Sequence, residues 1–282
     1  MDKIAIIGLV GKTIFMEVPR FHKGGETIVA KGIHEEWGGK GFNQAIAAAR
    51  QDAAVSFLGA ASAADAKAIT EFCRTEGVTA KMCVKRQATA CAAILTDGTG
   101  ETRVTAYPGA QLSAKDVDGF AGSIATADFL LLNNEVPEEV NLAAVEIAKH
   151  YGVRIVFNPA PARKLPKAIL EAVSIFTPNE FEEKEILAGI TSFIPHPSSF
   201  PEVITTLGAK GCRIRSTGEV IPAPAAKAVD STGAGDTFNA VLATRLSEGD
   251  SLRDACVAAN AAAAQSVAVR YVIPSLPFRT NP

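Results

Sequence analysis

The chain has 282 residues, 48% hydrophobic and 21% charged, which excludes a disordered or fibrous protein and allows one large domain or two unequal ones. Its formal net charge of −2 argues against a protein that coats nucleic acid, because such proteins carry a basic excess. No apolar run reaches the ~18 residues of a membrane span. The five scattered cysteines form no C-x-x-C pair, which indicates a reducing cytoplasm and neither a zinc site nor a disulfide framework.

Apolar runs alternate with alanine-rich helical patterns along most of the chain. Strands are predicted over residues 3–9, 55–58, 129–132, 153–157, 174–177, 203–207 and 212–216. Helices are predicted over residues 41–50, 63–75, 137–151, 164–172, 180–187, 234–247 and 252–269. Continuous apolar strands separated by helices are typical of a mostly parallel sheet that helices cover on both faces.

Two stretches, residues 12–37 and 88–107, break this alternation, because they have β-type patterns without intervening helices. Residues 96–100, Thr-Asp-Gly-Thr-Gly, form the turn of a predicted hairpin. We therefore expect a small sheet, serving as a lid or a dimer surface, beside an α/β domain formed by residues 1–11, 38–87 and 108–282. Residues 191–201 contain three prolines, which predicts a loop in the short segment 188–202.

Polar residues follow three successive predicted strands. Asn133, Asn134 and Glu135 come after one strand, Asn158 after the next, and Asn179 after the third. Helix capping explains such residues one by one. Their repetition favours a polar crevice instead, because ligands of open parallel sheets bind beyond the carboxyl ends of the strands.

The strongest local motif is residues 230–238, Asp-Ser-Thr-Gly-Ala-Gly-Asp-Thr-Phe, which lead directly into an apolar helix. Glycines let several backbone N–H groups point the same way, and a helix amino terminus adds positive potential, so this segment predicts a phosphate pocket. Asp236 would lie against the bound anion, where a carboxylate is a candidate general base for a hydroxyl that attacks the phosphate. A favourable partner of the helix dipole is the alternative role for this residue.

A second glycine cluster, residues 37–45, also opens a helix. Its glycines would permit close approach of a ligand, and Lys40 and Asn43 could bind hydroxyl groups; a tight strand-to-helix turn is the structural alternative. Residues 8–13 resemble the end of a Walker loop, but Ile6 stands where that motif requires glycine. The four histidines show no metal-ligand spacing and are expected at the surface.

Residues 38–45 and 230–238, with residues 158–163 and 177–180 between them, resemble the signatures of the ribokinase/PfkB family of carbohydrate kinases over nearly the whole chain. The resemblance implies a three-layer α/β/α sandwich with a small β-sheet lid. It implies an ATP-dependent kinase that phosphorylates a sugar hydroxymethyl group with Mg²⁺, and a homodimer formed through the lid. A kinase for a ketohexose, sugar acid or nucleoside is the alternative within this class, and a non-catalytic sugar or nucleotide sensor is the alternative outside it.

The resemblance also assigns site residues. It places the catalytic base at Asp236 and the anion hole at Gly233, Ala234 and Gly235, and it places the sugar contacts at Gly39, Lys40, Asn43 and Glu135. The nucleotide contacts are expected at Asn179, Thr206, Gly208, Gly211 and Asn260. The resemblance assigns Mg²⁺, bound through water, to Glu182, and a monovalent cation, with K⁺ as the expected ion, to Asp230 and Ser275. Thr13 stands where the family usually has an aspartate that binds sugar hydroxyls. A hydroxyl in place of a carboxylate loses a charge-assisted hydrogen bond, so this departure affects the choice of sugar.

Overall fold

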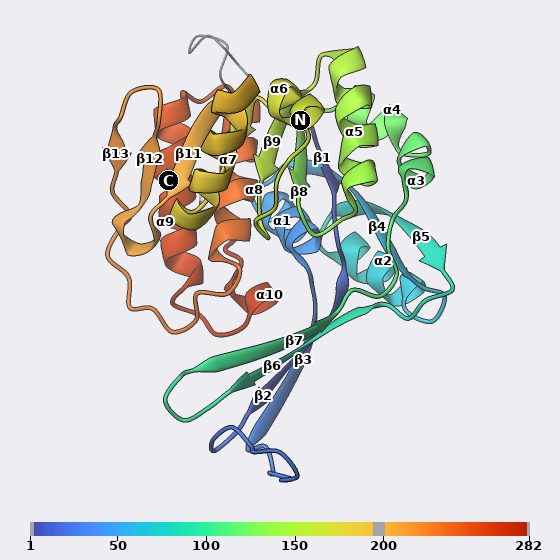
Figure 1. The fold of residues 1–282 in the computed structure, drawn as a ribbon, viewed down its shortest axis with the longest axis vertical. Coiled ribbons are helices and arrows are strands. Elements are labelled where there is room, and N and C mark those ends of the chain that lie inside the picture. The colour runs from blue at the N-terminus through green and yellow to red at the C-terminus, as the bar shows by residue number, and fades with distance from the viewer. Residues whose placement is uncertain (1–2, 194–200, 281–282) are drawn as a thin grey trace.

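The computed structural model describes residues 3–193 and 201–280 and contains one nine-stranded and one four-stranded sheet (Figure 1). In chain order, the strands of the large sheet are β1 (Lys3–Ile7), β4 (Ala54–Ser62), β5 (Val78–Lys85), β8 (Phe129–Asn133), β9 (Arg154–Asn158), β10 (Ile175–Phe176), β11 (Glu202–Thr206), β12 (Cys212–Ile214) and β13 (Val220–Ile221). Their order is β13-β12-β11-β10-β9-β8-β1-β4-β5, and only the pairings of β12 are antiparallel. The parallel strands therefore carry their carboxyl ends to one edge.

Helices cover both faces of the large sheet, as its apolar strands require. Along β1, Ile4 and Ile6 enter one apolar core, while Ala5 and Ile7 enter the other. The first face carries α1 (Lys40–Ala49), α2 (Ala66–Thr75), α8 (Ala234–Ser247) and α9 (Leu252–Ser266); the second carries α3 (Ala114–Asp118), α4 (Ala121–Ala125), α5 (Glu138–Tyr151), α6 (Lys167–Ala172) and α7 (Glu180–Phe193). Within the described residues, no helix has the length and apolar character to cross a bilayer.

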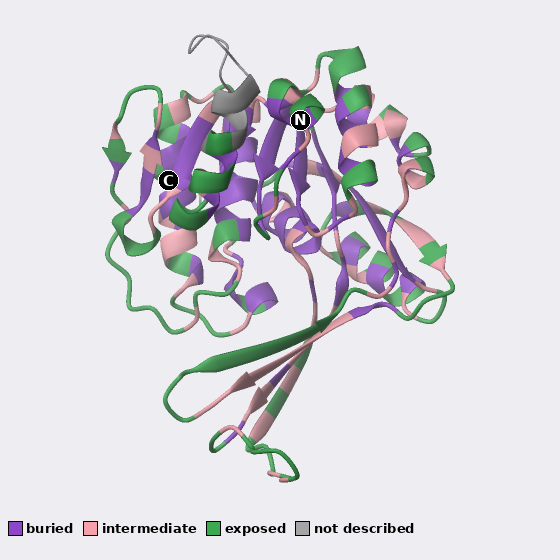
Figure 2. Ribbon diagram, viewed as in Figure 1, coloured by how far each residue is buried: buried purple, intermediate pink, exposed green. Residues whose placement is uncertain are grey.

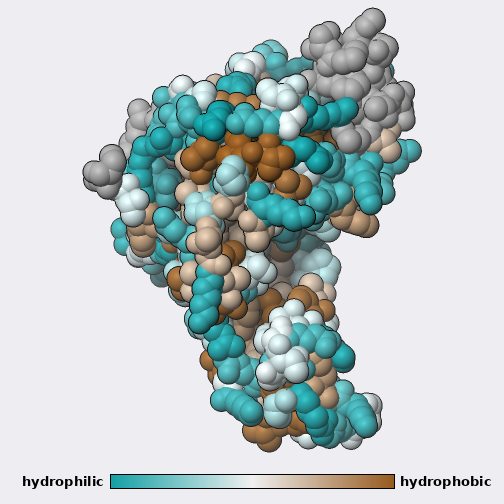
Figure 3. All heavy atoms as spheres, turned by 90° about the vertical axis from the view of Figure 1, so that its left-hand side faces the viewer, coloured by the Kyte–Doolittle hydropathy of each residue, from teal (hydrophilic) through white to brown (hydrophobic). Residues whose placement is uncertain are grey.

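The four-stranded sheet projects from this body and is called the small sheet below (Figure 1). It consists of β2 (Gly11–Glu17), β3 (Gly32–Gly38), β6 (Ala90–Thr96) and β7 (Thr102–Tyr107) in the order β3-β2-β6-β7. In the side view it forms a narrower lobe below the body (Figure 3). Most of its residues are intermediate or exposed, whereas the central strands of the large sheet are buried (Figure 2). The predicted α/β/α sandwich with a small separate β-sheet is confirmed.

Several local predictions were incomplete or wrong. Strand β5 was not predicted, because as an edge strand it alternates polar and apolar residues and lacks a continuous apolar run. The short elements α3, α4, β13 and α10 (Val272–Ser275) were also missed. Helix α6 begins only after Pro166, and α9 ends at Ser266 instead of residue 269.

The predicted loop over residues 191–201 is wrong at its start, because α7 continues to Phe193. A proline restricts the residue just before it, so Pro195 does not prevent helix up to that point. Residues 194–200 lie outside the described part of the chain. The prediction that all histidines are exposed holds for His22 and His150 but not for His34, which is half-buried; His196 lies outside the described residues.

Candidate active site

Two cavities meet at the amino terminus of α8, beyond the carboxyl ends of the parallel strands. The first, of about 490 Å³, reaches from Gly233 and Asp236 to the small sheet; we call it the sheet-side cavity. The second, of about 540 Å³, is lined by Ala234, Gly235 and the loop 223–228; we call it the loop-side cavity. Because successive residues of one helical turn line different cavities, two ligands bound there would approach each other across the start of α8.

Asp236 is buried, with an exposed fraction of 5%, where α1 meets α8. Its two carboxylate oxygens accept hydrogen bonds from Asn43 Nδ2 at 2.8 Å and from Gln44 Nε2 at 3.2 Å. Burial raises the pKa of Asp236, while Lys40 and the two amide groups act in the opposite direction. The two amides fix the carboxylate so that it faces the sheet-side cavity, which Asp236 lines.

Lys40 and Glu135 extend the charged part of this cavity. The pKa of Lys40 is raised, chiefly by Asp236 and further by Glu135 and Glu182, against the effect of burial. Glu135 accepts a hydrogen bond from the Lys40 backbone N–H at 2.6 Å, and burial raises its pKa to about 7 although Lys40 lowers it. One cation therefore lies among three carboxylates, and it can neutralise negative charge on a bound ligand as well.

The glycines of residues 38–41 have a structural role that supports the tight-turn interpretation. Gly39 has a φ of 107°, and a Cβ atom there would lie 2.6 Å from the carbonyl oxygen of Leu9. A Cβ at Gly41 would lie 2.5 Å from the Cα of Gly8, so α1 and the end of β1 touch through backbone alone. This close contact brings Lys40 and Asn43 to the cavity, where Asn43 Oδ1 is buried without a hydrogen-bond partner among the described residues.

The small sheet supplies the opposite wall of the sheet-side cavity. Thr13, which the sequence assigns to the substrate, lines it. Alternation along the strands brings a set of apolar residues to the same wall, which comprises Phe15, Ala92, Ile94, Val104 and Ala106. None of these five residues was predicted from the sequence. Their period-2 spacing was the available signal, but it does not show which face of a strand meets a ligand.

The loop-side cavity gathers four of the five residues that the resemblance assigns to a nucleotide, and Asn179 is not among the residues that line it. Thr206, Gly208, Gly211 and Asn260 line it together with small apolar residues of the loop 223–228 and of α9. Asn260 Nδ2 donates to the Ile221 carbonyl at 2.9 Å, so this side chain also holds β13 in place. A Cβ at Gly208 or Gly235 would meet nothing within 4 Å, which shows open space beside both backbones.

The start of α8 has the geometry of an anion site. Gly233 precedes the helix with a φ of 81°, in the left-handed region that favours glycine. The Ala234 N–H donates to the Ser231 carbonyl at 3.3 Å, so one of the predicted anion-hole amides has an internal partner. The N–H groups of Gly235 and Asp236 have no acceptor among the described residues, and a helix start leaves such donors for a ligand.

Asn179 and Glu182 cap α7. The Asn179 Oδ1 accepts the Glu182 N–H at 2.8 Å, and the Glu182 carboxylate accepts the Asn179 N–H at 2.9 Å, which is a reciprocal capping box. The capping interpretation is thus correct for this pair. It does not exclude a second role, because Glu182 contributes to the raised pKa of Lys40 and therefore lies near the charged cavity wall.

Asp230 and Ser275 lie on the two segments that border Gly233. Asp230 accepts the Thr232 N–H at 2.9 Å and the Tyr271 N–H at 3.1 Å, one at each carboxylate oxygen. Ser275 is buried and donates to the Val272 carbonyl at 2.8 Å. Both side chains keep oxygen lone pairs, so the donor set is compatible with a cation, although each already has a protein partner.

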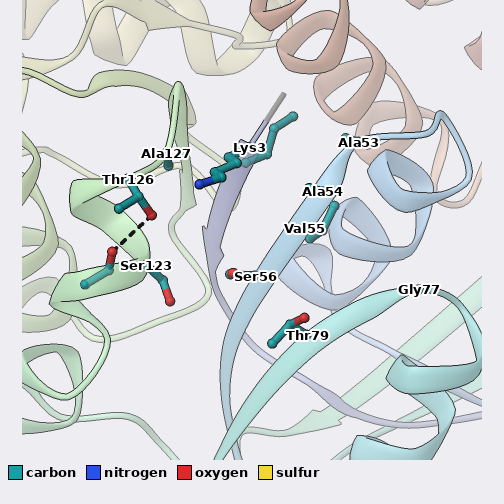
Figure 4. A pocket seen from close by; sticks show the side chains of 12 residues that line it. Lys3, Ala53, Ala54, Val55, Ser56, Gly77, Thr79, Ser123, Thr126 and Ala127 are labelled. Atoms are coloured by element: carbon teal, nitrogen blue, oxygen red, sulfur yellow. Dashed lines mark hydrogen bonds between the residues drawn. The ribbon is translucent and has the colours of Figure 1, made fainter. Parts of the chain in front are cut away.

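A third cavity, of about 430 Å³, lies at the amino ends of β1 and β4, away from α8 (Figure 4). Lys3 is the one charged residue among the described residues that line it, beside Ser56, Thr79, Ser123 and Thr126. The Thr126 hydroxyl donates to the Gly122 carbonyl at 3.2 Å and is therefore partnered within its own helix end. Since this lining, as described, includes no carboxylate, the third cavity offers no candidate general base.

Residues 1–279 match the family model of the pfkB family carbohydrate kinases, and the chain belongs to this family. It is a carbohydrate kinase, as the sequence predicted. It is 34% identical to the ribokinase of Haemophilus influenzae over 98% of this chain and 95% of that protein. Among solved structures, Thermotoga maritima ribokinase is similar with a TM-score of 0.85 and 31% identity, covering 99% of this chain and 97% of that one. Arabidopsis thaliana ribokinase complexed with ribose and ATP is similar with a TM-score of 0.84 and 28% identity, covering 98% of this chain and 96% of that one.

Proposed function

We propose that this carbohydrate kinase transfers the γ-phosphoryl group of ATP to the hydroxymethyl group of a ribose-like sugar. The observation that carries the proposal is the position of Asp236, buried at the single helical turn where the two cavities meet. The sugar would occupy the sheet-side cavity and the nucleotide the loop-side cavity. The relative crystallised with ribose and ATP supports both ligands.

The residues of this chain would divide the chemistry among them. Asp236 accepts the proton of the attacking hydroxyl, and Asn43 and Gln44 keep its carboxylate oriented for that transfer. The N–H groups at the start of α8 bind the charge that builds on the transferred phosphoryl group. Asn43 Oδ1, which lacks a partner in the described structure, accepts a sugar hydroxyl.

The loop-side cavity fits a nucleotide, and Glu182 fits Mg²⁺ bound through water. Small residues line the cavity, and the open space at Gly235 leaves room for phosphate oxygens beside the helix start. Among the described residues, no three acidic, histidine or cysteine side chains cluster as a metal site. Mg²⁺ keeps most of its waters and is commonly held by substrate phosphates with one or two carboxylates, a role that Glu182 can supply. When bound, the ion would neutralise charge on the phosphates.

We further assign a monovalent cation, with K⁺ as the expected ion, to Asp230 and Ser275. A cation there would lie beside the anion hole, because both residues flank the segments that contact Gly233. The rate in K⁺ would then exceed the rate in Na⁺ or tetramethylammonium buffer. Equal rates in the three buffers would contradict the assignment.

The small sheet would act as a lid and as the contact of a homodimer in the cytoplasm. Its wall over the sheet-side cavity is mostly apolar, as a cover that excludes water requires, with Lys12 and Thr13 as the polar residues of β2 that line it. The opposite face exposes Ile33, whose exposed fraction is 63%, and Tyr107 at the edge of the cavity is 52% exposed. Exposed apolar residues on a projecting sheet favour burial against a second copy, which sedimentation over a range of concentrations would test. The five free thiols are consistent with a reducing compartment.

A panel of acceptors tests the function. Purified protein with ATP and Mg²⁺ is mixed with pentoses, ketohexoses, sugar acids and nucleosides, and ADP release is measured with and without each acceptor. Release that depends on ribose above the other acceptors supports the proposal. Preference for another acceptor would move the substrate to that class, and binding without release would identify a sensor.

A further inference from the structure

The small sheet touches the body at a second place besides the cavity, in residues 270–273. Glu17 of β2 pairs with Arg270, and Phe15 and His34 contact the ring of Tyr271, His34 stacking on it with centroids 3.8 Å apart. Tyr271 has a φ of 67°, which non-glycine residues seldom adopt, so surrounding contacts must hold it in this conformation. The segment is therefore fixed from the small sheet rather than by its own backbone preference.

Glu36 of β3 makes the most direct of these contacts. Its carboxylate accepts the Val272 N–H at 2.9 Å and the Ile273 N–H at 3.3 Å, and its side chain is only 7% exposed. His34 Nε2 lies 3.1 Å from the same carboxylate. On the far side, Arg50, the residue that follows α1, donates to the carbonyl groups of Ile273 and Leu276 at 2.7 and 2.9 Å. A carboxylate at the N–H end and a guanidinium at the carbonyl end thus clamp this single turn.

The clamped turn borders the anion hole. A Cβ at Gly233 would lie 2.6 Å from Val272 Cγ1, so the Val272 side chain occupies the space directly beside the residue that precedes α8. Val272 also lines the sheet-side cavity. Asp230 joins the same two segments by binding the N–H groups of Thr232 and Tyr271. A shift of residues 271–273 would therefore move Val272 away from Gly233 and loosen the start of α8.

We propose that Glu36 is a positioning residue for phosphoryl transfer, which holds Val272 against Gly233 only while the small sheet is seated on the body. The anion hole then has its working geometry in the covered state of the site and loses it when the sheet moves away. This inference rests on the proposed kinase reaction. It gives the small sheet a role in the rate of transfer, beyond covering the sugar.

The test compares Glu36→Gln with Glu35→Gln. Glu35 is the matched control, because it lies next to Glu36 but on the exposed opposite face of β3. The Glu36→Gln side chain would keep one acceptor oxygen and lose the second, charge-assisted hydrogen bond, for which we expect a kcat roughly tenfold lower. The KM for ATP should change less than about threefold, because Glu36 does not line the loop-side cavity. An unchanged kcat, or a loss confined to the KM of the sugar, would overturn the proposal.

Two further measurements separate positioning from general destabilisation. Hydrogen exchange of the Val272 and Ile273 amides should accelerate in Glu36→Gln but not in Glu35→Gln, and the fluorescence of Trp37, the single tryptophan, reports whether the sheet itself loosens. In a cycle with Val272→Ala, the two losses in kcat should not multiply, because both remove the same contact with Gly233. Multiplying losses would overturn the proposal. The exchange experiment needs no turnover, so failure of the kinase assignment would be recognised separately.

Discussion

The large sheet and the small sheet build opposite walls of one cavity from different kinds of structure. Ile4 and Ile6 of β1 are at most 1% exposed and lie between two layers of helices. Every residue of β7, in contrast, is exposed, and Val104 and Ala106 of this strand line the cavity. The body holds its side chains by packing from both sides, whereas the small sheet is supported on the cavity side and at residues 270–273.

This difference assigns different tasks to the two regions. Asp236 is buried and oriented by two amides of the rigid α1–α8 contact, which suits a group that must stay within hydrogen-bond reach of the reacting hydroxyl. Thr13 stands on the small sheet, away from the buried α1–α8 contact, and lines the cavity, which suits a group that selects among sugars. We therefore expect body residues to set the rate and cavity-facing sheet residues to set the acceptor preference, with Glu36 as the link between them.

The largest effect is expected for Asp236→Asn. Asparagine has nearly the same shape but cannot accept the proton, so kcat should fall by about 10²–10⁴-fold. ATP affinity should be retained, because the loop-side cavity does not include this side chain. Asp250→Asn, at the far end of α8 outside both cavities, is the control and should leave kcat unchanged. A kcat within about threefold of the wild type would remove the base assignment, provided that chemistry limits the rate.

A change of acceptor preference is expected for Thr13→Asp. A carboxylate on the cavity wall accepts hydrogen bonds from two adjacent hydroxyls, so kcat/KM for neutral vicinal diols should rise roughly tenfold relative to sugar acids. Thr105→Asp is the matched control, because Thr105 is exposed and does not line the cavity. If all acceptors shift by the same factor, Thr13 is structural and the proposed division between body and sheet is wrong at this residue.

A smaller effect is expected for Glu182→Gln. Glutamine at the third position of a helix still completes a capping box, so α7 should keep its start while the charge near Lys40 is removed. The Mg²⁺ concentration for half-maximal rate should then rise several-fold, with little change in thermal stability. An unchanged Mg²⁺ titration would leave Glu182 with the capping role alone.

Much of the fold of the body could be predicted from the sequence, and the sequence motifs of the body predicted a phosphoryl-transfer reaction. Continuous apolar strands and the glycine-rich segment 230–238 are signals that depend on neighbouring residues only, and the structure places Asp236 at the start of a helix as they indicate. The cavity wall that the small sheet forms was harder to predict from the sequence, because the alternation of residues in β6 and β7 does not show which face of each strand meets the cavity. Glu36 gave no signal at all, since its partners Val272 and Ile273 lie 236 and 237 residues away along the chain.

The last prediction concerns the charge that the body keeps beside Lys40. Burial raises the pKa of Glu135 from its ordinary value of 4.5 to about 7, so the folded state binds this proton more tightly than the unfolded state. The resulting stabilisation is present below pH 4.5 and is lost as the pH rises through about 7. Glu135→Gln keeps an oxygen for the Lys40 N–H but carries no charge, so its free energy of unfolding should match the wild type at about pH 4, below the unfolded pKa, and exceed it by roughly 1–3 kcal/mol at about pH 8.

Urea unfolding at both pH values measures this difference, and Glu139→Gln, an exposed carboxylate in the first turn of α5 shortly after Glu135, is the control, for which we expect a much smaller difference. Asp236 has a raised pKa as well and raises the pKa of Glu135, so the difference between the two proteins reports Glu135 together with its interaction with Asp236. Equal stability of variant and wild type at the higher pH would show that the attraction of Lys40 offsets burial completely. The carboxylate on the body side of the cavity would then carry no stability cost, and the contrast with the small sheet, whose wall includes no carboxylate among the described lining residues, would be one of selectivity alone.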